Sequence, residues 1–185
     1  MTQANKKYEL LESDTVTTPS GRVLKRIRAL VAIGTLVAAG DLGGYIESEE
    51  NLSQVSGNAW VSGNARVSGD ARVYGDAWVS GDAQVSGNAR VSGNARVYGN
   101  ARVSGDARVE RRHDIFWISI IGSENGTYTA FKNKDGGISV NRGCFNGTLK
   151  QFIDAVNERH TGQFHQEYQL VIELTKVRLN VNMEA

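Results

Sequence analysis

Arginine and aromatic side chains recur in the middle of the chain at spacings that favour the binding of an anion. Between residues 56 and 109 the pattern Ser/Tyr, Gly, Asn/Asp, Ala, variable residue, Val occurs nine times. Taken eighteen residues apart, the variable residues and the tyrosines two positions further on form three columns: Trp60, Trp78, Arg96 and Tyr98; Arg66, Gln84 and Arg102; and Arg72, Tyr74, Arg90 and Arg108. Guanidinium groups hold phosphates or carboxylates, and aromatic rings stack on planar groups. Together they suit a nucleotide.

The third column is an unbroken arginine ladder, which consists of Arg72, Arg90 and Arg108, with Tyr74 beside it. Guanidinium groups about 4.8 Å apart repel one another unless an anion or an acidic surface lies over them. The structural alternative is that the arginine stems cover apolar strand surface while solvent and corner Asp residues screen the charge. Both interpretations stay open, and the ligand-binding hypothesis also includes Arg96 and Tyr98.

Trp60 and Trp78 begin the first column and give it an aromatic stripe. An exposed stripe of large apolar residues usually marks a contact surface. We therefore expect Trp60 and Trp78 to lie at an interface between subunits. A stacking platform for a planar ligand is the alternative.

The sequence supports a catalytic site less strongly than a binding site. Cys144 lies in a glycine-flanked turn before an expected helix start, where its thiol could act as a nucleophile with His160 as the base. The alternative is a small buried residue in a tight turn, and the spacing alone does not bring the two residues together. The three histidines, His113, His160 and His165, lack metal-ligand spacing. We predict no metal and no cofactor, and the sequence leans against an enzyme. Four hairpin residues form a further weak polar pocket: Tyr128, Lys132, Lys134 and Arg142.

A strict period of six fits neither a helix nor a simple strand and predicts a β-helix. Ten valines recur every six residues from Val55 to Val109, Ala lets each corner close, and Gly with Asn or Asp forms the bend. At a spacing of eighteen, Asn58 stands over Asp76 and the other corners alternate in the same way, whereas six or twelve would place Asp on Asp. Because like charges on neighbouring strands destabilise a sheet, we expect triangular 18-residue coils.

The hexads, of which Ser56-Gly57-Asn58-Ala59-Trp60-Val61 is the first, resemble those of the hexapeptide-repeat proteins. The segments 39–47, 49–53, 121–127 and 143–149 resemble those that flank the coils in repeat proteins of bacteriophages and prophages, a family of largely unknown function. The resemblance covers nearly the whole chain and implies a left-handed parallel β-helix and a homotrimer packed side by side. Hexapeptide-repeat acyltransferases use a histidine base and usually a loop that interrupts a coil, and residues 56–109 contain neither.

Three regions are expected. Residues 1–54 contain strands at 8–11 and 21–31 and a distorted first coil at 36–54, which together cap the open edge of the coils, with a basic anion site as the alternative. Residues 55–110 form the β-helix. Residues 111–185 form a small α+β domain with strands at 114–121, 127–132 and 138–142, a helix from Thr148 to about Glu158, and a second helix at 167–179, where a strand is the alternative.

Composition limits the function further. The net charge of +1 gives no strong signal for nucleic acid or membrane, the apolar run 29–39 is too short to span a bilayer, and the single cysteine suits a reducing cytoplasm. We expect a non-catalytic cytoplasmic protein of a phage or prophage that captures an anionic small molecule, such as a nucleotide signal of host defence, at subunit boundaries or in the C-terminal domain. A structural module for trimerisation and protein interaction, and an enzyme of unrecognised type, are the alternatives.

The homotrimer is directly testable. Light scattering of the purified protein should give a mass near three times 20.1 kDa. A monomer at micromolar concentration would contradict the assembly and would leave the aromatic column without a partner subunit.

Overall fold

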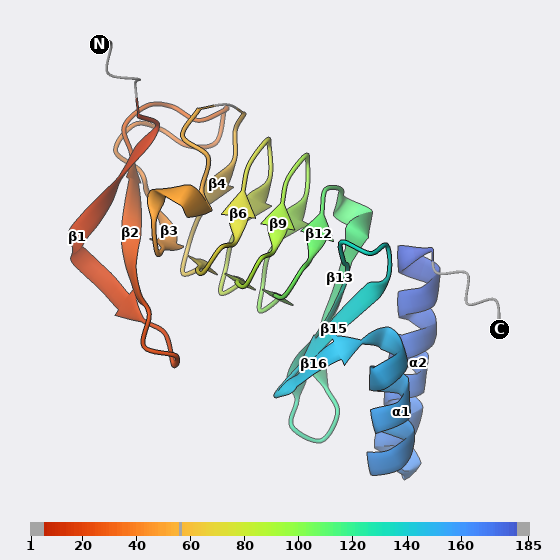
Figure 1. The fold of residues 1–185 in the computed structure, drawn as a ribbon. Coiled ribbons are helices and arrows are strands. Elements are labelled where there is room, and N and C mark those ends of the chain that lie inside the picture. The colour runs from red at the N-terminus through yellow and green to blue at the C-terminus, as the bar shows by residue number, and fades with distance from the viewer. Residues whose placement is uncertain (1–5, 56, 181–185) are drawn as a thin grey trace.

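The computed structural model describes residues 6–55 and 57–180 and arranges them as three parts in a row (Figure 1). An N-terminal hairpin leads into stacked coils, which are followed by a small sheet and two helices. The hairpin, the first coil and its 3₁₀ helix are β1 (Tyr8–Thr17), β2 (Val23–Ala29), β3 (Leu42–Ile46) and η1 (Glu49–Asn51). The coil strands are β4 (Trp60–Val61), β5 (Arg66–Val67), β6 (Arg72–Val73), β7 (Trp78–Val79), β8 (Gln84–Val85), β9 (Arg90–Val91), β10 (Arg96–Val97), β11 (Arg102–Val103) and β12 (Arg108–Val109). The C-terminal elements are η2 (Arg112–Asp114), β13 (Ile115–Ile121), β14 (Gly126–Lys132), β15 (Ile138–Arg142), β16 (Phe145–Thr148), α1 (Leu149–Arg159) and α2 (Gly162–Leu179).

The coil strands stack in three parallel columns, β4–β7–β10, β5–β8–β11 and β6–β9–β12, which confirms the parallel β-helix with 18-residue coils. The hexad valines from Val61 onward and the hexad alanines are fully or almost fully buried and fill the interior. At the corners, the amides of Asn58, Asn64 and Asn88 donate to the carboxylates eighteen residues further on, at 2.9, 3.3 and 3.1 Å. The alternation of Asn and Asp therefore joins coils as well as avoiding like charges.

Glycine is required at the corners because the chain turns there with a positive φ. All nine hexad glycines have φ between 57° and 72°. A Cβ at Gly57 would also lie 2.1 Å from the carbonyl oxygen of Gly75 in the next coil. Both the backbone angle and the close approach of the coils exclude a larger residue at this corner.

The repeat begins one valine later than the sequence pattern indicates. Val55 is 85% exposed, so the prediction that it belongs to the inward row is wrong. Leu52 takes the place next to Val73 instead, and Ile46 pairs with Val67. Both pairs are 21 residues apart, three more than the 18 that separate paired residues in the regular coils. The extra residues confirm a distorted coil at this point and turn Val55 outward.

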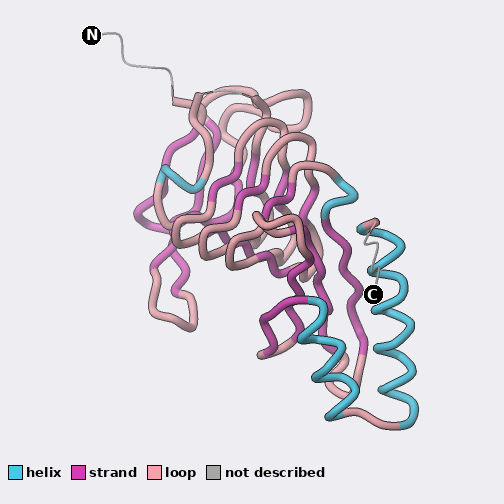
Figure 2. Tube along the Cα trace, turned by 45° about the vertical axis from the view of Figure 1, so that its right-hand side comes forward, coloured by secondary structure: helices cyan, strands magenta, loops and turns pink. Residues whose placement is uncertain are grey.

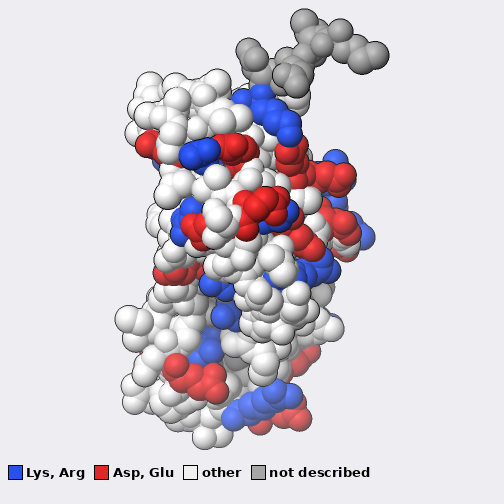
Figure 3. Space-filling view, turned by 90° about the vertical axis from the view of Figure 1, so that its left-hand side faces the viewer, with Lys and Arg blue, Asp and Glu red and all other residues white. Residues whose placement is uncertain are grey.

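The N-terminal hairpin caps the open edge of this first coil. Strand β2 pairs antiparallel with β3, so that β1–β2–β3 extends the column β5–β8–β11 into one six-stranded sheet. Lys6, Arg22, Lys25, Arg26 and Arg28 each form an ion pair with a carboxylate of the same region. Figure 3, which faces this end of the molecule, shows acidic and basic groups interspersed. The paired charges favour the cap over the alternative of a basic anion site.

The C-terminal part is an antiparallel sheet in the order β13–β14–β15–β16, with α1 and α2 packed against it (Figure 2). The expected strands and both expected helices are present, and Thr148 accepts a hydrogen bond from the backbone N–H of Gln151 as the cap of α1. Two features differ from expectation. Strand β16 is added where Asn146 and Gly147 indicated only a turn, because it pairs with β15. Helix α2 begins at Gly162, five residues before the predicted start.

Asp114 fixes this sheet to the end of the coils. Its side chain is 7% exposed and accepts hydrogen bonds from the backbone N–H groups of Glu110 and Arg111, and its carboxylate lies 2.9 Å from the Lys132 ammonium. Burial alone would raise the pKa of Asp114, but Lys132 and the two N–H groups outweigh it and lower the pKa. Ile115 and Phe131 continue the apolar core of the coils into the sheet.

We predict that Asp114→Asn lowers the free energy of unfolding by about 1–3 kcal/mol at neutral pH, because Lys132 and the backbone N–H groups lose a charged acceptor. The lowered pKa means that the native state binds this proton more weakly than the unfolded chain. The stabilisation is therefore complete above the unfolded pKa of about 4 and is lost as the pH falls below it.

Urea unfolding at several pH values tests this prediction, with Asp135→Asn in an exposed turn as the matched control. The difference in the free energy of unfolding between wild type and Asp114→Asn should become smaller in acid, and Asp135→Asn should have the same free energy of unfolding as wild type. An equal gap at all pH values would contradict the assigned role of the carboxylate.

Candidate functional site

The arginine ladder lies in register as predicted, but its members behave differently. Arg72 pairs with Arg90, and Arg90 with Arg108, on neighbouring parallel strands. Arg108 folds back and donates from Nη1 to the carbonyl oxygens of Asn88 at 3.2 Å and Ala107 at 2.8 Å. Arg72 and Arg90 form no ion pair with any residue that the structure describes. The Arg72 and Arg90 guanidinium groups therefore have no ion-pair partner among the described residues, whereas Nη1 of Arg108 is bonded to the backbone and its other donors remain open to a ligand.

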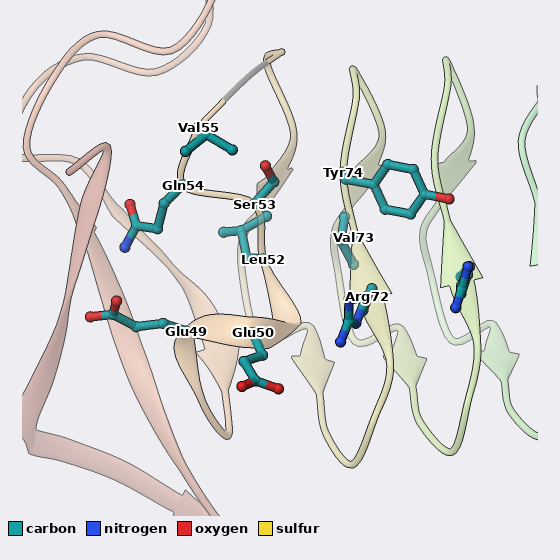
Figure 4. Close-up of a pocket in the computed structure, with 10 residues that line it drawn as sticks. Glu49, Glu50, Leu52, Ser53, Gln54, Val55, Arg72, Val73 and Tyr74 are labelled. Carbon is teal, nitrogen blue, oxygen red and sulfur yellow. The ribbon is translucent and has the colours of Figure 1, made fainter. Parts of the chain in front are cut away.

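Arg72, Arg90 and Tyr74 line one cavity of about 500 Å³ between the first coil and the regular coils. Figure 4 shows Arg72 and Tyr74 on and just after β6, and Glu49 and Glu50 on the neighbouring η1, with the Glu49 carboxylate directed away from Arg72. Glu49 is paired with Lys6, and Glu50 has no basic partner among the described residues. The cavity thus holds two guanidinium groups and two carboxylates, so its field is not uniformly positive.

Trp60 is not part of an exposed stripe. It is 1% exposed and lies under the hairpin, where its ring contacts that of Tyr8 edge to face at 6.4 Å between centroids. The expectation that Trp60 is exposed is wrong because β1 covers this end of the column. Trp78 is half-buried, donates from Nε1 to Ser62 Oγ at 3.2 Å, and has the Arg96 guanidinium 5.8 Å from its ring. Subunit packing through Trp78 stays a prediction.

Arg96 and Tyr98 lie in a second cavity, of about 490 Å³, where the last coil meets η2, β13 and the end of α2. We call it the junction cavity. Its lining consists of Arg96, Tyr98, Arg112, Ile115, Phe116, Trp117 and Arg178. Tyr98 meets Trp117 edge to face at 4.4 Å between ring centroids. The lining contains three arginines and three aromatic residues but no carboxylate, which makes it the more electropositive of the two cavities.

Sequence reasoning missed Arg112, Trp117 and Arg178, which complete the junction cavity. They come from η2, β13 and α2, outside the periodic coils. The eighteen-residue spacing that aligns Arg96 with its column therefore does not predict that they lie near it. Arg96 is itself held in place because Nη1 donates to the carbonyl oxygen of Asp76 at 2.7 Å. Trp117 gave one signal in the sequence, since a tryptophan in a short apolar strand after the repeat is a candidate contact residue.

Cys144 and His160 line a third cavity, of about 240 Å³, within the C-terminal part. Cys144 is exposed, so the expectation of a buried residue in a tight turn is wrong, because the turn before β16 projects outward. The His160 ring packs on Tyr168 at 5.0 Å between centroids, and no hydrogen bond joins it to Cys144 among the described residues. Cys144 and His160 therefore line one cavity without being hydrogen-bonded to each other.

The four hairpin residues of the weak polar pocket do not form one site, although Tyr128 and Arg142 are paired on β14 and β15. Tyr128 is buried and shares a hydrogen bond with Thr175 at 3.0 Å, and burial raises its pKa to about 12. Lys132 binds Asp114, and Lys134 binds Asp106. Within residues 6–55 and 57–180 no group of three His, Cys, Asp or Glu side chains is placed to hold a metal ion.

Comparison with known families identifies the coils. Four overlapping or neighbouring stretches, residues 53–67, 65–81, 83–99 and 95–111, match the family described as YdcK Beta solenoid repeat. By its fold, the chain is a β-solenoid repeat protein. The matched stretches contain Arg72, Arg90, Arg96 and Tyr98, but neither the N-terminal hairpin nor most of the C-terminal part. No curated protein matches the chain. None of the helices in the described part of the β-solenoid protein is long and apolar enough to cross a membrane.

The different environments of Arg90 and Arg108 lead to a prediction about stability. Arg90→Gln should leave the free energy of unfolding unchanged or slightly raised, because two like-charge contacts disappear. Arg108→Gln should lower it by about 1 kcal/mol, because a shorter side chain cannot reach the Asn88 carbonyl. Urea unfolding of both variants at low and high salt measures the difference. Equal destabilisation by the two changes would show that Arg90 also has a structural role.

Proposed function

We propose that this β-solenoid protein is a non-catalytic binding protein that captures an anionic ligand with a planar group in the junction cavity. The observation that carries the proposal is the composition of the lining, in which Arg96, Arg112 and Arg178 accompany Tyr98, Phe116 and Trp117 without a carboxylate. Arg112 and Arg178 form no ion pair with a described acidic residue. A ligand anion would therefore neutralise charges that the protein itself leaves uncompensated.

The size and chemistry of the junction cavity suit a nucleotide-like molecule. Its volume of about 490 Å³ lies within the range of about 300–1,000 Å³ typical of small-molecule sites. A charge-assisted hydrogen bond contributes about 1.5–3 kcal/mol, and stacking of a base on an aromatic side chain about 1–3 kcal/mol. Phosphate on the arginines and a base against Trp117 would use both contributions. The cavity at Arg72 and Arg90 suits an anion less well, because Glu49 and Glu50 share it.

The wider form of the proposal rests on the resemblance to phage and prophage repeat proteins. In that form the protein is a cytoplasmic homotrimer that removes a nucleotide signal of host defence. One observation favours a second candidate, a structural module for protein interaction. Leu170, Leu174 and Val177 on α2 are exposed and recur at spacings of four and three residues, which places an apolar stripe on the outside of the helix.

Isothermal titration of wild type with AMP, ADP, ATP and cyclic nucleotides, and with uncharged adenosine as the ligand control, tests the proposal. We expect at least one nucleotide to bind and adenosine to bind much more weakly. Arg112→Gln and Arg178→Gln should each weaken binding about tenfold or more, which corresponds to about 1.4 kcal/mol. Quenching of the tryptophan fluorescence of the protein, to which Trp117 contributes, should follow the same titration curve.

Arg72→Gln is the matched control, because it removes the same charge from the other cavity. If Arg72→Gln weakens nucleotide binding about tenfold and Arg112→Gln has no effect, the binding site lies at the arginine ladder instead. Failure of every phosphate-bearing ligand to bind would contradict the proposed function and favour the interaction module.

A further inference from the structure

Arg142 is a buried cation with too few partners. Its side chain is 9% exposed. Nη2 donates to the carbonyl oxygen of Ile121 at 2.8 Å, and the guanidinium also hydrogen-bonds with the Tyr168 hydroxyl, which leaves most of its five N–H donors without a partner. The Glu124 carboxylate lies 3.6 Å from Nη1, and the Glu124 side chain is 79% exposed. The Nε atom is buried and has no partner. Such a group costs free energy unless an anion compensates its charge.

The fold keeps the Arg142 guanidinium in place. A Cβ at Gly126 would lie 2.5 Å from Arg142 Nη1, and a Cβ at Gly122 would lie 2.0 Å from the Tyr168 hydroxyl. The hairpin between β13 and β14 thus closes around the guanidinium on one side, while the Tyr168 ring lies 5.8 Å from it on another. A cation held so tightly is prepared for a ligand because little side-chain freedom is lost when the ligand binds.

The third cavity, which we call the Arg142 cavity, offers the remaining contacts. Besides Arg142, its lining includes two further nitrogen-bearing side chains, Arg159 and His160, and an apolar group formed by Phe145, Phe152 and Val156. Arg159 has no ion pair with a described residue, and Glu124 is the one carboxylate among the lining residues. Phe145 and Phe152 pack edge to face at 5.2 Å between centroids and form an apolar wall.

We infer that the Arg142 cavity binds a small organic acid, with its carboxylate on Arg142 and Arg159 and its apolar body against Phe145 and Phe152. The cavity volume of about 240 Å³ is below the usual range of about 300–1,000 Å³ and excludes a nucleotide-sized ligand. A planar carboxylate also matches the paired donors of a guanidinium, which a compact ammonium would not offer. This site is separate from the junction cavity and does not depend on the proposed function.

Cys144 reports on occupancy, because it lines the same cavity, is exposed and is the single cysteine of the chain. Alkylation by iodoacetamide, followed by intact mass, measures access to Cys144. Because Cys144 also borders a neighbouring cavity of about 260 Å³ that Arg102 and Asn146 line, the Arg159→Gln variant assigns any protection to the Arg142 cavity. Benzoate serves as the probe, benzamide as its uncharged counterpart, and inorganic phosphate as an anion without an apolar body. Sodium chloride keeps the ionic strength equal in all samples.

Benzoate at about ten times its dissociation constant should slow alkylation about tenfold, because only about one protein molecule in eleven is then free. Benzamide and phosphate should leave the rate unchanged. Arg159→Gln should reduce the protection at a fixed benzoate concentration, and Arg142→Lys should abolish it. Circular dichroism establishes whether Arg142→Lys folds; if it does not, Arg159→Gln alone decides.

Three outcomes would overturn the inference. One is alkylation that benzoate does not slow. Another is equal protection by benzoate and benzamide, which would indicate apolar contact without recognition of charge. The third is full protection in Arg159→Gln, which would place the benzoate away from the two arginines.

Discussion

Coil-to-coil hydrogen bonding at a constant offset is the constraint on which the rest of this protein depends. The N–H of Arg72 donates to the carbonyl oxygen of Ala89, and that of Arg90 to Ala107, each at 2.9 Å. These bonds set a register of eighteen residues, which places valine over valine inside and corner amide over carboxylate outside. Because side chains on stacked strands point the same way, any residue type repeated every eighteen positions becomes a continuous surface. The arginine ladder and the aromatic column are consequences of this offset.

The ends of the coils decide what these surfaces can do. The first column begins under Tyr8 and ends beside Trp117, so one end is closed by the hairpin and the other forms the wall of the junction cavity. The third column begins beside Glu49 and Glu50 and ends at Arg108, whose Nη1 donates to two backbone carbonyls. Hexads that share one pattern thus acquire different properties, because the non-repetitive segments cover them differently.

The sequence predicts the coils well because their constraints are local and repeated. Valine, alanine, glycine and the alternating corner residues each carry the same information nine times, and together they specify the period, the interior and the register. Single non-repeated contacts escape this reasoning. Tyr8 covers Trp60 from more than fifty positions away, and Arg178 reaches the junction cavity from the last turn of the final helix. Strand β16 forms only because β15 offers it an edge, which its own residues do not reveal. The candidate site was therefore half predicted: Arg96 and Tyr98 were found, and their partners from η2, β13 and α2 were not.

The constant offset also makes each coil a unit of length. Removing or adding eighteen residues between the two caps would change the height of the coils by one strand spacing, about 4.8 Å, and leave every corner amide facing a corner residue of the same column. Neither the hairpin nor the C-terminal sheet would have to alter its own contacts. The number of coils therefore sets the distance between the cavity at Arg72 and Arg90 and the junction cavity, independently of what either one binds.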